Sequence, residues 1–145
     1  MLSRRWLQFR IASLFGVVTI IAICLGIGPQ IYAYINVRFL SNNDLRVDGT
    51  PLGLSVILNT SSAKRLRWLG KKANPSLLSA MRDPNRFAAA HVLLSEINLR
   101  EQQLSSAEWN HMRIDLYADG TVDLHPRQAE KLERYWKETL GVCQP

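Results

Sequence analysis

The sequence predicts an α+β protein in which one transmembrane helix precedes a small domain. Three stretches lead to this class. Residues 11–28 carry no charge, residues 61–97 have helical apolar spacing, and residues 113–125 alternate between apolar and polar side chains. The expected parts are a basic cytoplasmic N-terminus (1–10), a transmembrane helix (11–35), a juxtamembrane loop with short strands (36–60) and a small α+β domain (61–145).

The uncharged segment is long enough to cross a membrane as a helix. From Ile11 to Gly28 it would rise about 27 Å, which is close to the thickness of a hydrocarbon core. Pro29 is expected to kink or end this helix, and Tyr32 and Tyr34 then fall where interfacial aromatic residues gather. The segment therefore predicts a membrane span.

A cleaved signal peptide is the alternative explanation of this segment. The run "GIGPQIYAYIN" lacks small residues at the two key positions of a signal peptidase site. Cys24 follows Ile23, whereas a lipoprotein signal needs a small residue before its cysteine. These features favour an anchor that is retained.

The charges around the segment predict its orientation. Arg4, Arg5 and Arg10 precede it without any acidic residue, whereas Arg38 on the far side is soon followed by Asp44. By the positive-inside rule, the N-terminus stays in the cytoplasm and the remainder of the chain lies outside it. We expect a single-pass protein of the cell membrane.

Three helices are expected in short succession after the juxtamembrane loop. They occupy residues 62–73, 75–82 and 84–97. Asn74-Pro75 and Asp83-Pro84 each combine an N-cap residue with proline at the first helical position. The third helix is apolar nearly all round, which predicts that it is buried.

The helical segment resembles a HEAT-like repeat. In "NPSLLSAMRDPNRFAAAHVLL" a leucine-bearing helix ends at an Asp-Pro turn, and an alanine-rich helix follows. The resemblance implies a HEAT-like helical pair or triplet, although one unit cannot form a solenoid because stacking needs about three units. The whole chain, from "RRWLQFRIASLFGVVTIIAICLG" through the HEAT-like unit with "FAAAHVLL" to the hairpin and the last helix, resembles short N-terminally membrane-anchored proteins of planctomycete bacteria. That resemblance places no catalytic residue on this sequence.

The C-terminal part predicts a β-hairpin. "SSAE" at 105–108 matches a capping box for a short helical turn before the hairpin. "RIDLYADGTVDLH" then alternates strictly, and a three-residue loop at 118–120 would place Leu116 opposite Val122. This register puts apolar side chains on one face.

An amphipathic helix is expected after the hairpin, from near Pro126 to Gly141. Its opposite face offers Glu130–Arg134 and Glu133–Lys137 pairs. The apolar face consists of Ala129, Leu132, Trp136 and Leu140.

His91, inside "RFAAAHVLLSEI", is the first candidate for chemistry. Its neighbours on the helix face, Phe87, Ala90 and Leu94, offer no nucleophile or acid, and a general base needs a reacting partner within hydrogen-bond reach. We therefore expect a buried neutral imidazole that hydrogen-bonds a nearby group.

No zinc site is expected. Such a site needs three or four ligands, and His91, His111 and His125 have no local pairing at helical spacing. Cys24 in the predicted span and Cys143 near the C-terminus exclude a zinc ribbon or a disulfide framework.

An EF-hand loop is matched only in part. Asp115 and Asp119 take its first and fifth positions, but Tyr117 and Pro126 take the third and twelfth, where calcium ligands are required. Asp115 opposite Asp123 could attract a cation weakly, although a solvated acidic strand face is the favoured interpretation.

The sequence contains no G-x-S-x-G, no glycine-rich phosphate loop and no H-E-x-x-H, and no cofactor is expected. Catalytic groups can also assemble in space from distant parts of a chain. An envelope enzyme whose site is not visible in the sequence is therefore the alternative function.

One cluster of basic residues stands out, in "KRLRWLGKK" from Lys64 to Lys72. On a helical wheel its cations share an arc of about 160° with an aromatic residue in the middle. The candidate contact residues are Lys64, Arg65, Arg67, Trp68, Lys71 and Lys72.

These features predict a membrane-anchored, non-enzymatic interaction module. The basic cluster would dock on anionic lipid headgroups or on an acidic protein, and a solvated face without a partner is the plain alternative. Nucleic acid suits the net charge of +6, but the predicted topology places the cluster outside the cytoplasm.

Overall fold

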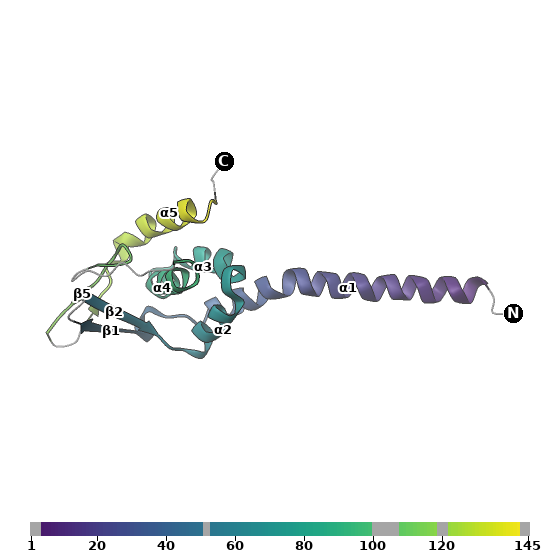
Figure 1. Ribbon diagram of the computed structural model, residues 1–145, viewed down its shortest axis with the longest axis horizontal. Helices are drawn as coiled ribbons and strands as arrows, with labels where there is room; N and C mark the ends of the chain where they lie inside the picture. Colours follow the sequence, from purple (N-terminus) through teal and green to yellow (C-terminus); the bar gives the residue numbers. More distant parts are fainter. Residues whose placement is uncertain (1–3, 51–52, 100–107, 119–121, 143–145) are drawn as a thin grey trace.

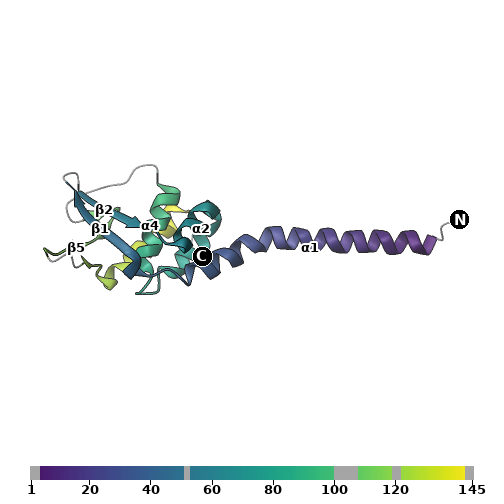
Figure 2. The ribbon, with the colours of Figure 1, turned by 90° about the horizontal axis from the view of Figure 1, so that it is seen from below.

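The computed structural model describes residues 4–50, 53–99, 108–118 and 122–142. One long helix, α1 (Arg4–Val37), projects from a small domain that holds the other elements (Figures 1 and 2). The described part of the domain combines short helices with two-stranded antiparallel hairpins. The predicted mixture of helices and short strands is therefore confirmed.

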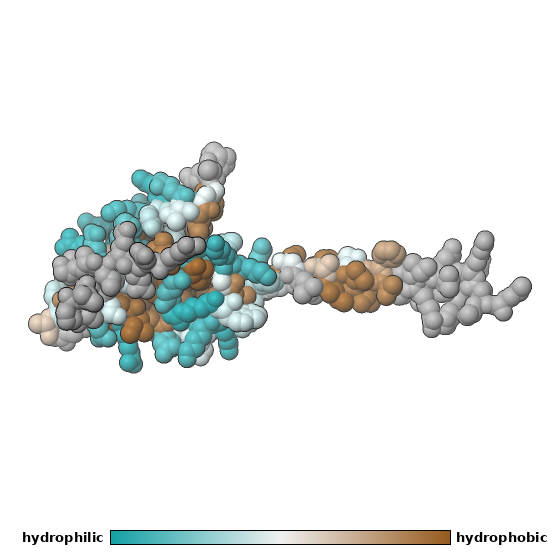
Figure 3. Space-filling model, in the orientation of Figure 1, coloured by the Kyte–Doolittle hydropathy of each residue, from teal (hydrophilic) through white to brown (hydrophobic). Residues whose placement is uncertain are grey.

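α1 is an unbroken helix of 34 residues. Its section Leu14–Val37 is long and apolar enough to cross a membrane. Large apolar side chains such as Phe15 and Ile20 are exposed along it, and Figure 3 shows this hydrophobic surface over the middle of the helix. The expected N-terminal apolar helix is thus present.

Two strands follow the short 3-10 helix Asn42–Asp44. β1 (Leu45–Thr50) pairs antiparallel with β2 (Gly53–Leu58), and Val47 lies opposite Val56. Val56 and Leu58 are buried, since alternate residues of a strand face the same side. The short strands expected in the juxtamembrane segment form this hairpin.

α2 (Ser61–Leu69) is shorter than the sequence predicts. The helix expected over 62–73 ends at Leu69 because Gly70 has a φ of 57°, which glycine adopts without steric cost. A 3-10 helix (Gly70–Ala73) continues the chain. The residues after Leu69 therefore leave the helical wheel assumed for the basic cluster.

α3 (Asn74–Ala80) follows directly, so Asn74 is not the N-cap that its position before proline predicts. Its side chain instead exchanges hydrogen bonds of 3.0 and 3.1 Å with Asn98 at the end of α4 (Phe87–Asn98). α3 and α4 contact each other. A HEAT-like pair remains a prediction.

α4 is the central helix of the domain. It begins at Phe87, three residues later than expected, and its first N–H groups need a partner from elsewhere. Asn42 supplies this partner, because its Oδ1 accepts from the N–H groups of Ala88 (3.0 Å) and Ala89 (3.2 Å). Residues from Phe87 to Leu94 are fully buried, as the apolar circumference predicts.

Two small hairpins precede the last helix. β3 (Glu108–Trp109) pairs with β4 (Met112–Arg113), and β5 (Asp115–Leu116) pairs with β6 (Val122–Asp123). Leu116 lies opposite Val122, so the register predicted from the alternation is confirmed there. Most of the expected capping box at 105–108 falls outside the described residues, and Glu108 lies in a strand.

α5 (Ala129–Thr139) is the predicted amphipathic helix, preceded by a 3-10 helix (Pro126–Gln128). Leu132 and Trp136 are fully buried, and α5 packs against α4. On the other side, Glu133 and Lys137 form the expected pair with an O–N distance of 2.9 Å.

The domain end of α1 belongs to the hydrophobic core. Ala33, Asn36 and Val37 are buried where α1 contacts α2 and α3. Pro29 lies inside α1 and does not end it. The apolar helix and the domain are therefore joined without a linker.

Candidate functional site

The basic cluster lies beside α1, on α2 and the 3-10 helix that follows it. Ala63 and Leu66 turn one face of α2 into the core, which leaves the opposite face in solvent. Trp68 is 82% exposed on that face. We call Lys64, Arg65, Trp68, Lys71 and Lys72, which are all exposed, the basic face.

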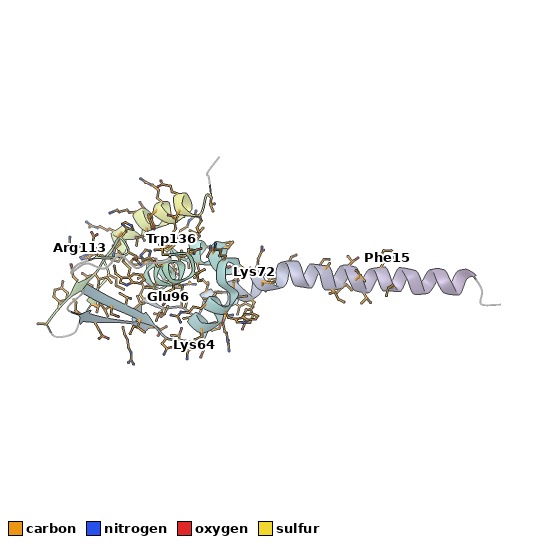
Figure 4. The ribbon with its side chains drawn as sticks, viewed as in Figure 1. Phe15, Lys64, Lys72, Glu96, Arg113 and Trp136 are labelled. Carbon is orange, nitrogen blue, oxygen red and sulfur yellow. The ribbon has the colours of Figure 1, made fainter. Side chains whose placement is uncertain are left out.

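The basic face follows the last turns of α1. At one end, Arg65 Nη1 lies 3.5 Å from Oδ1 of the buried Asn36. At the other end, Lys71 and Lys72 line a hollow of about 210 Å³ together with Gly26, Pro29 and Gln30. Figure 4 shows Lys72 at this junction and Lys64 at the edge of the domain.

Arg67 has a different place from the other cations. Its Nε and Nη2 donate to the two carboxylate oxygens of Glu96 at 2.7 and 2.9 Å, and Nη2 also donates to the carbonyl oxygen of Leu58. Arg67 comes one helical turn after the buried Ala63, so its side chain points along the core side of α2. It therefore joins α2 to α4 and β2 and is not part of the basic face.

A groove of about 740 Å³ is lined by residues of α3 and by the C-terminal end of α5 and the residues after it. Pro75 and Leu78 of α3 line one side, and Leu140 and Val142 line the other. Val142 is 48% exposed, although it is an apolar residue. We call this feature the α3–α5 groove.

The end of α5 explains why Val142 lines the groove. Gly141 has a φ of 66°, and the N–H of Val142 donates to the carbonyl oxygen of Lys137 at 2.9 Å. This is the hydrogen bond of a Schellman motif, in which the chain folds back over the last turn of the helix.

Among the charged side chains that line the α3–α5 groove, cations outnumber acidic residues. Arg82 and Lys137 both contact Glu133, at 3.0 and 2.9 Å, and Lys71 lies on the rim. Burial would raise the pKa of Glu133, but hydrogen bonds from Lys137 and Arg82 outweigh it and hold that pKa below its usual value. Glu133 is therefore an ionised acceptor and not an acid.

His91 is fully buried under α5. Its Nδ1 accepts a hydrogen bond of 2.8 Å from Trp136 Nε1, and its ring lies 5.8 Å from those of Trp109 and Trp136. Loss of solvation lowers the pKa of His91 to about 4. Hydrogen bonds with the backbone of Asn110 and Trp109 raise this pKa, but their effect is weaker. The neutral buried imidazole expected from the sequence is present.

The acidic hairpin face has basic partners that the sequence did not reveal. Asp115 lies opposite Asp123 and contacts His125 Nε2 at 2.5 Å and Arg113 Nε at 3.4 Å. The hydrogen bond with His125 lowers the pKa of Asp115. Across the described ranges, no three His, Cys, Asp or Glu side chains are grouped as a metal site requires.

The sequence also contains an S-x-x-K spacing, Ser61 to Lys64, at the start of α2. A serine–lysine pair acts as a nucleophile and base only where the lysine is desolvated. Both residues are exposed, so the spacing does not form such a pair.

No protein-family model, curated protein or solved structure matches the chain significantly. The resemblance to anchored planctomycete proteins therefore stays a prediction.

Proposed function

We propose that the protein is a single-pass membrane protein whose small domain is a non-enzymatic interaction module, docked through the basic face on anionic lipid headgroups. The N-terminus would lie in the cytoplasm and the domain on the outer surface of the cell membrane. An acidic protein partner is the alternative occupant of the basic face.

The spacing of cations along α1 carries the proposal. Lys71 and Lys72 sit at the level of Gly26 to Gln30 on α1, and Arg10 lies earlier in the same helix. At about 1.5 Å per residue, Arg10 is about 24 to 30 Å from that level, which matches the thickness of a hydrocarbon core. The two sets of cations would then lie in the two headgroup layers.

The rigid junction between helix and domain supports direct contact with the membrane. Because Ala33, Asn36 and Val37 are buried in the domain, a spanning α1 would hold the domain against the bilayer surface. Figure 3 shows hydrophilic side chains where the domain meets α1. Exposed tryptophan beside cations, as in Trp68, is typical of the membrane interface.

The charge of the basic face is sufficient for this role. Each cation near an anionic membrane surface contributes about 1 kcal/mol, so Lys64, Arg65, Lys71 and Lys72 together supply about 4 kcal/mol at low salt. Arg67 does not add to this sum because its charge is taken up by Glu96.

The titrating groups support a module over an enzyme. His91 is enclosed by the core and held neutral, and Glu133 and Asp115 are carboxylates with lowered pKa values. A general acid or base works best with a pKa near the working pH and in contact with substrate. None of these three groups meets both conditions.

Fluorescence quenching of Trp68 tests the docking in the full chain. The protein is placed in nanodiscs that contain phosphatidylcholine with a headgroup spin-labelled lipid as quencher, with or without phosphatidylglycerol. Trp6→Phe is the background, and the further change Trp68→Phe identifies the Trp68 signal. We expect Trp68 to be quenched more with phosphatidylglycerol, and the difference to vanish at about 0.5 M salt as screening shortens the Debye length.

Two matched charge reversals supply the control. Lys64→Glu, Arg65→Glu and Lys72→Glu together should remove the effect of phosphatidylglycerol. Arg127→Glu, Lys131→Glu and Arg134→Glu together should leave the effect of phosphatidylglycerol in place. All three positions are exposed, with Arg127 in the 3-10 helix before α5 and the other two on α5. Equal quenching in neutral and anionic nanodiscs would rule out docking through the charges of the basic face.

A further inference from the structure

We propose that the α3–α5 groove binds one anionic phospholipid molecule, with an acyl chain between α3 and α5 and the headgroup beside Lys71. This inference rests on the proposed membrane anchoring, because the lipid must reach the groove from the bilayer.

The walls of the groove suit a hydrocarbon chain. Pro75 and Leu78 face Leu140 and Val142 across it, and Leu78 and Leu140 are only partly buried. A volume of about 740 Å³ lies within the usual range for small-molecule sites. The Schellman motif keeps Val142 at this position although half of its surface is exposed.

The charge of the groove selects an anionic headgroup. Three cationic side chains (Lys71, Arg82 and Lys137) and one acidic side chain (Glu133) are among its described lining residues, which gives a net charge of +2. Glu133 already accepts from both Arg82 and Lys137. Lys71 contacts no carboxylate among the described ion pairs and is available to a phosphate.

The groove is continuous with the anchor. Lys71 and Pro75 line both the α3–α5 groove and the hollow beside Gly26, Pro29 and Gln30 of α1. If α1 spans the bilayer, this shared edge lies at the level of the headgroups. A lipid could then enter sideways, with its phosphate remaining in the headgroup layer.

Photolabelling of the full chain in nanodiscs tests the inference. The probe is phosphatidylglycerol with a photoreactive acyl chain, diluted in phosphatidylcholine, and labelled peptides are identified by mass spectrometry. We expect labelling of α1 and also of peptides containing Leu78 and Val142. The same photoreactive chain on phosphatidylcholine should label α1 equally and the groove peptides less.

Val142→Glu is the main variant, and Val122→Glu is its matched control. Both valines are partly exposed, at 48% and 36%, but Val122 lies on β6 away from the groove lining. A carboxylate facing the acyl chain should lower groove labelling about tenfold or more, while the control leaves it unchanged. Lys71→Gln should also lower labelling by the anionic probe, and Lys131→Gln should not.

Three results would overturn the inference: groove peptides without label while α1 is labelled, equal groove labelling by both probes, or equal losses in Val142→Glu and Val122→Glu. Absence of label on α1 would instead contradict the anchoring on which the inference rests. The two failures are therefore distinguishable.

Discussion

The burial of His91 predicts a loss of stability in mild acid. The pKa of this imidazole falls from 6.5 to about 4 in the folded protein because the core does not solvate a positive charge. The unfolded chain binds the proton near pH 6.5, whereas the folded chain does not. Stability is therefore full above pH 6.5 and declines as the pH falls towards 4.

The size of the effect follows from the shift. A difference of about 2.5 pKa units at 1.36 kcal/mol per unit corresponds to about 3 kcal/mol. His111 opposes protonation of His91 as well, although its charge is the smallest of the contributing causes. Carboxyl groups of unfolded chains also take up protons near pH 4, so the effect must be isolated by a variant that lacks the imidazole.

His91→Leu provides that comparison. Leucine should leave the fold intact and change the free energy of unfolding by no more than about 2 kcal/mol at pH 7, although Trp136 Nε1 loses its acceptor. Urea unfolding in a neutral detergent, followed by tryptophan fluorescence, gives the free energies. The difference between wild type and His91→Leu should shift by about 3 kcal/mol between pH 7 and pH 4.

His111→Gln is the matched control, since this histidine is exposed, whereas His91 is fully buried. The difference in free energy of unfolding between wild type and His111→Gln should vary far less with pH than that between wild type and His91→Leu. A constant difference between wild type and His91→Leu across the same range would show that the core accommodates the imidazolium, which would refute the reasoning.

Three further predictions concern the anchor, an ion pair and the end of α5. Replacing Arg4, Arg5 and Arg10 with glutamine should give mixed protease protection of the domain, because flanking cations set orientation; unchanged protection would contradict this. Arg67→Ala should lower the free energy of unfolding by about 2 kcal/mol, as measured in urea, because Glu96 and the Leu58 carbonyl lose a charged donor. Lys64→Ala, on the exposed face of α2, should change the free energy of unfolding by less than about 0.5 kcal/mol. Equal losses of this free energy in both variants would show that Arg67 behaves as a surface residue. Gly141→Ala should cost about 1 kcal/mol and lower the melting temperature, because a side chain is strained at a φ of 66°. Gly28→Ala, where an added Cβ meets nothing within 4 Å, should not lower the melting temperature. Equal losses of melting temperature in the two variants would contradict the Schellman motif as the reason for Gly141.

Local patterns account for what the sequence predicted correctly. Alternation in "RIDLYADGTVDLH" determines the pairing of Leu116 with Val122, because a shift by one residue would turn apolar side chains to the other face. The spacing of Leu132 and Trp136 likewise defines the buried side of α5. In both cases the partners lie close together in the chain.

Features that the sequence did not predict depend on contacts between distant segments. Asn42, which precedes the first hairpin in the chain, caps α4. Arg67 on α2 donates a hydrogen bond to Glu96 on α4. The α3–α5 groove exists only because two helices far apart in sequence pack side by side. No periodicity within one segment identifies such partners, and the helical wheel therefore grouped Arg67 with the exposed cations.

Thiol labelling in intact cells tests the central claim most directly, with Cys24 and Cys143 replaced by serine and single cysteines introduced at Ser3, Gly16 or Lys72. A membrane-impermeant reagent should label position 72 in intact cells, position 3 only after permeabilisation, and position 16 in neither case. This pattern follows from an α1 that spans the bilayer and a basic face at the outer headgroups. Labelling of position 16, or of position 3 in intact cells, would contradict it.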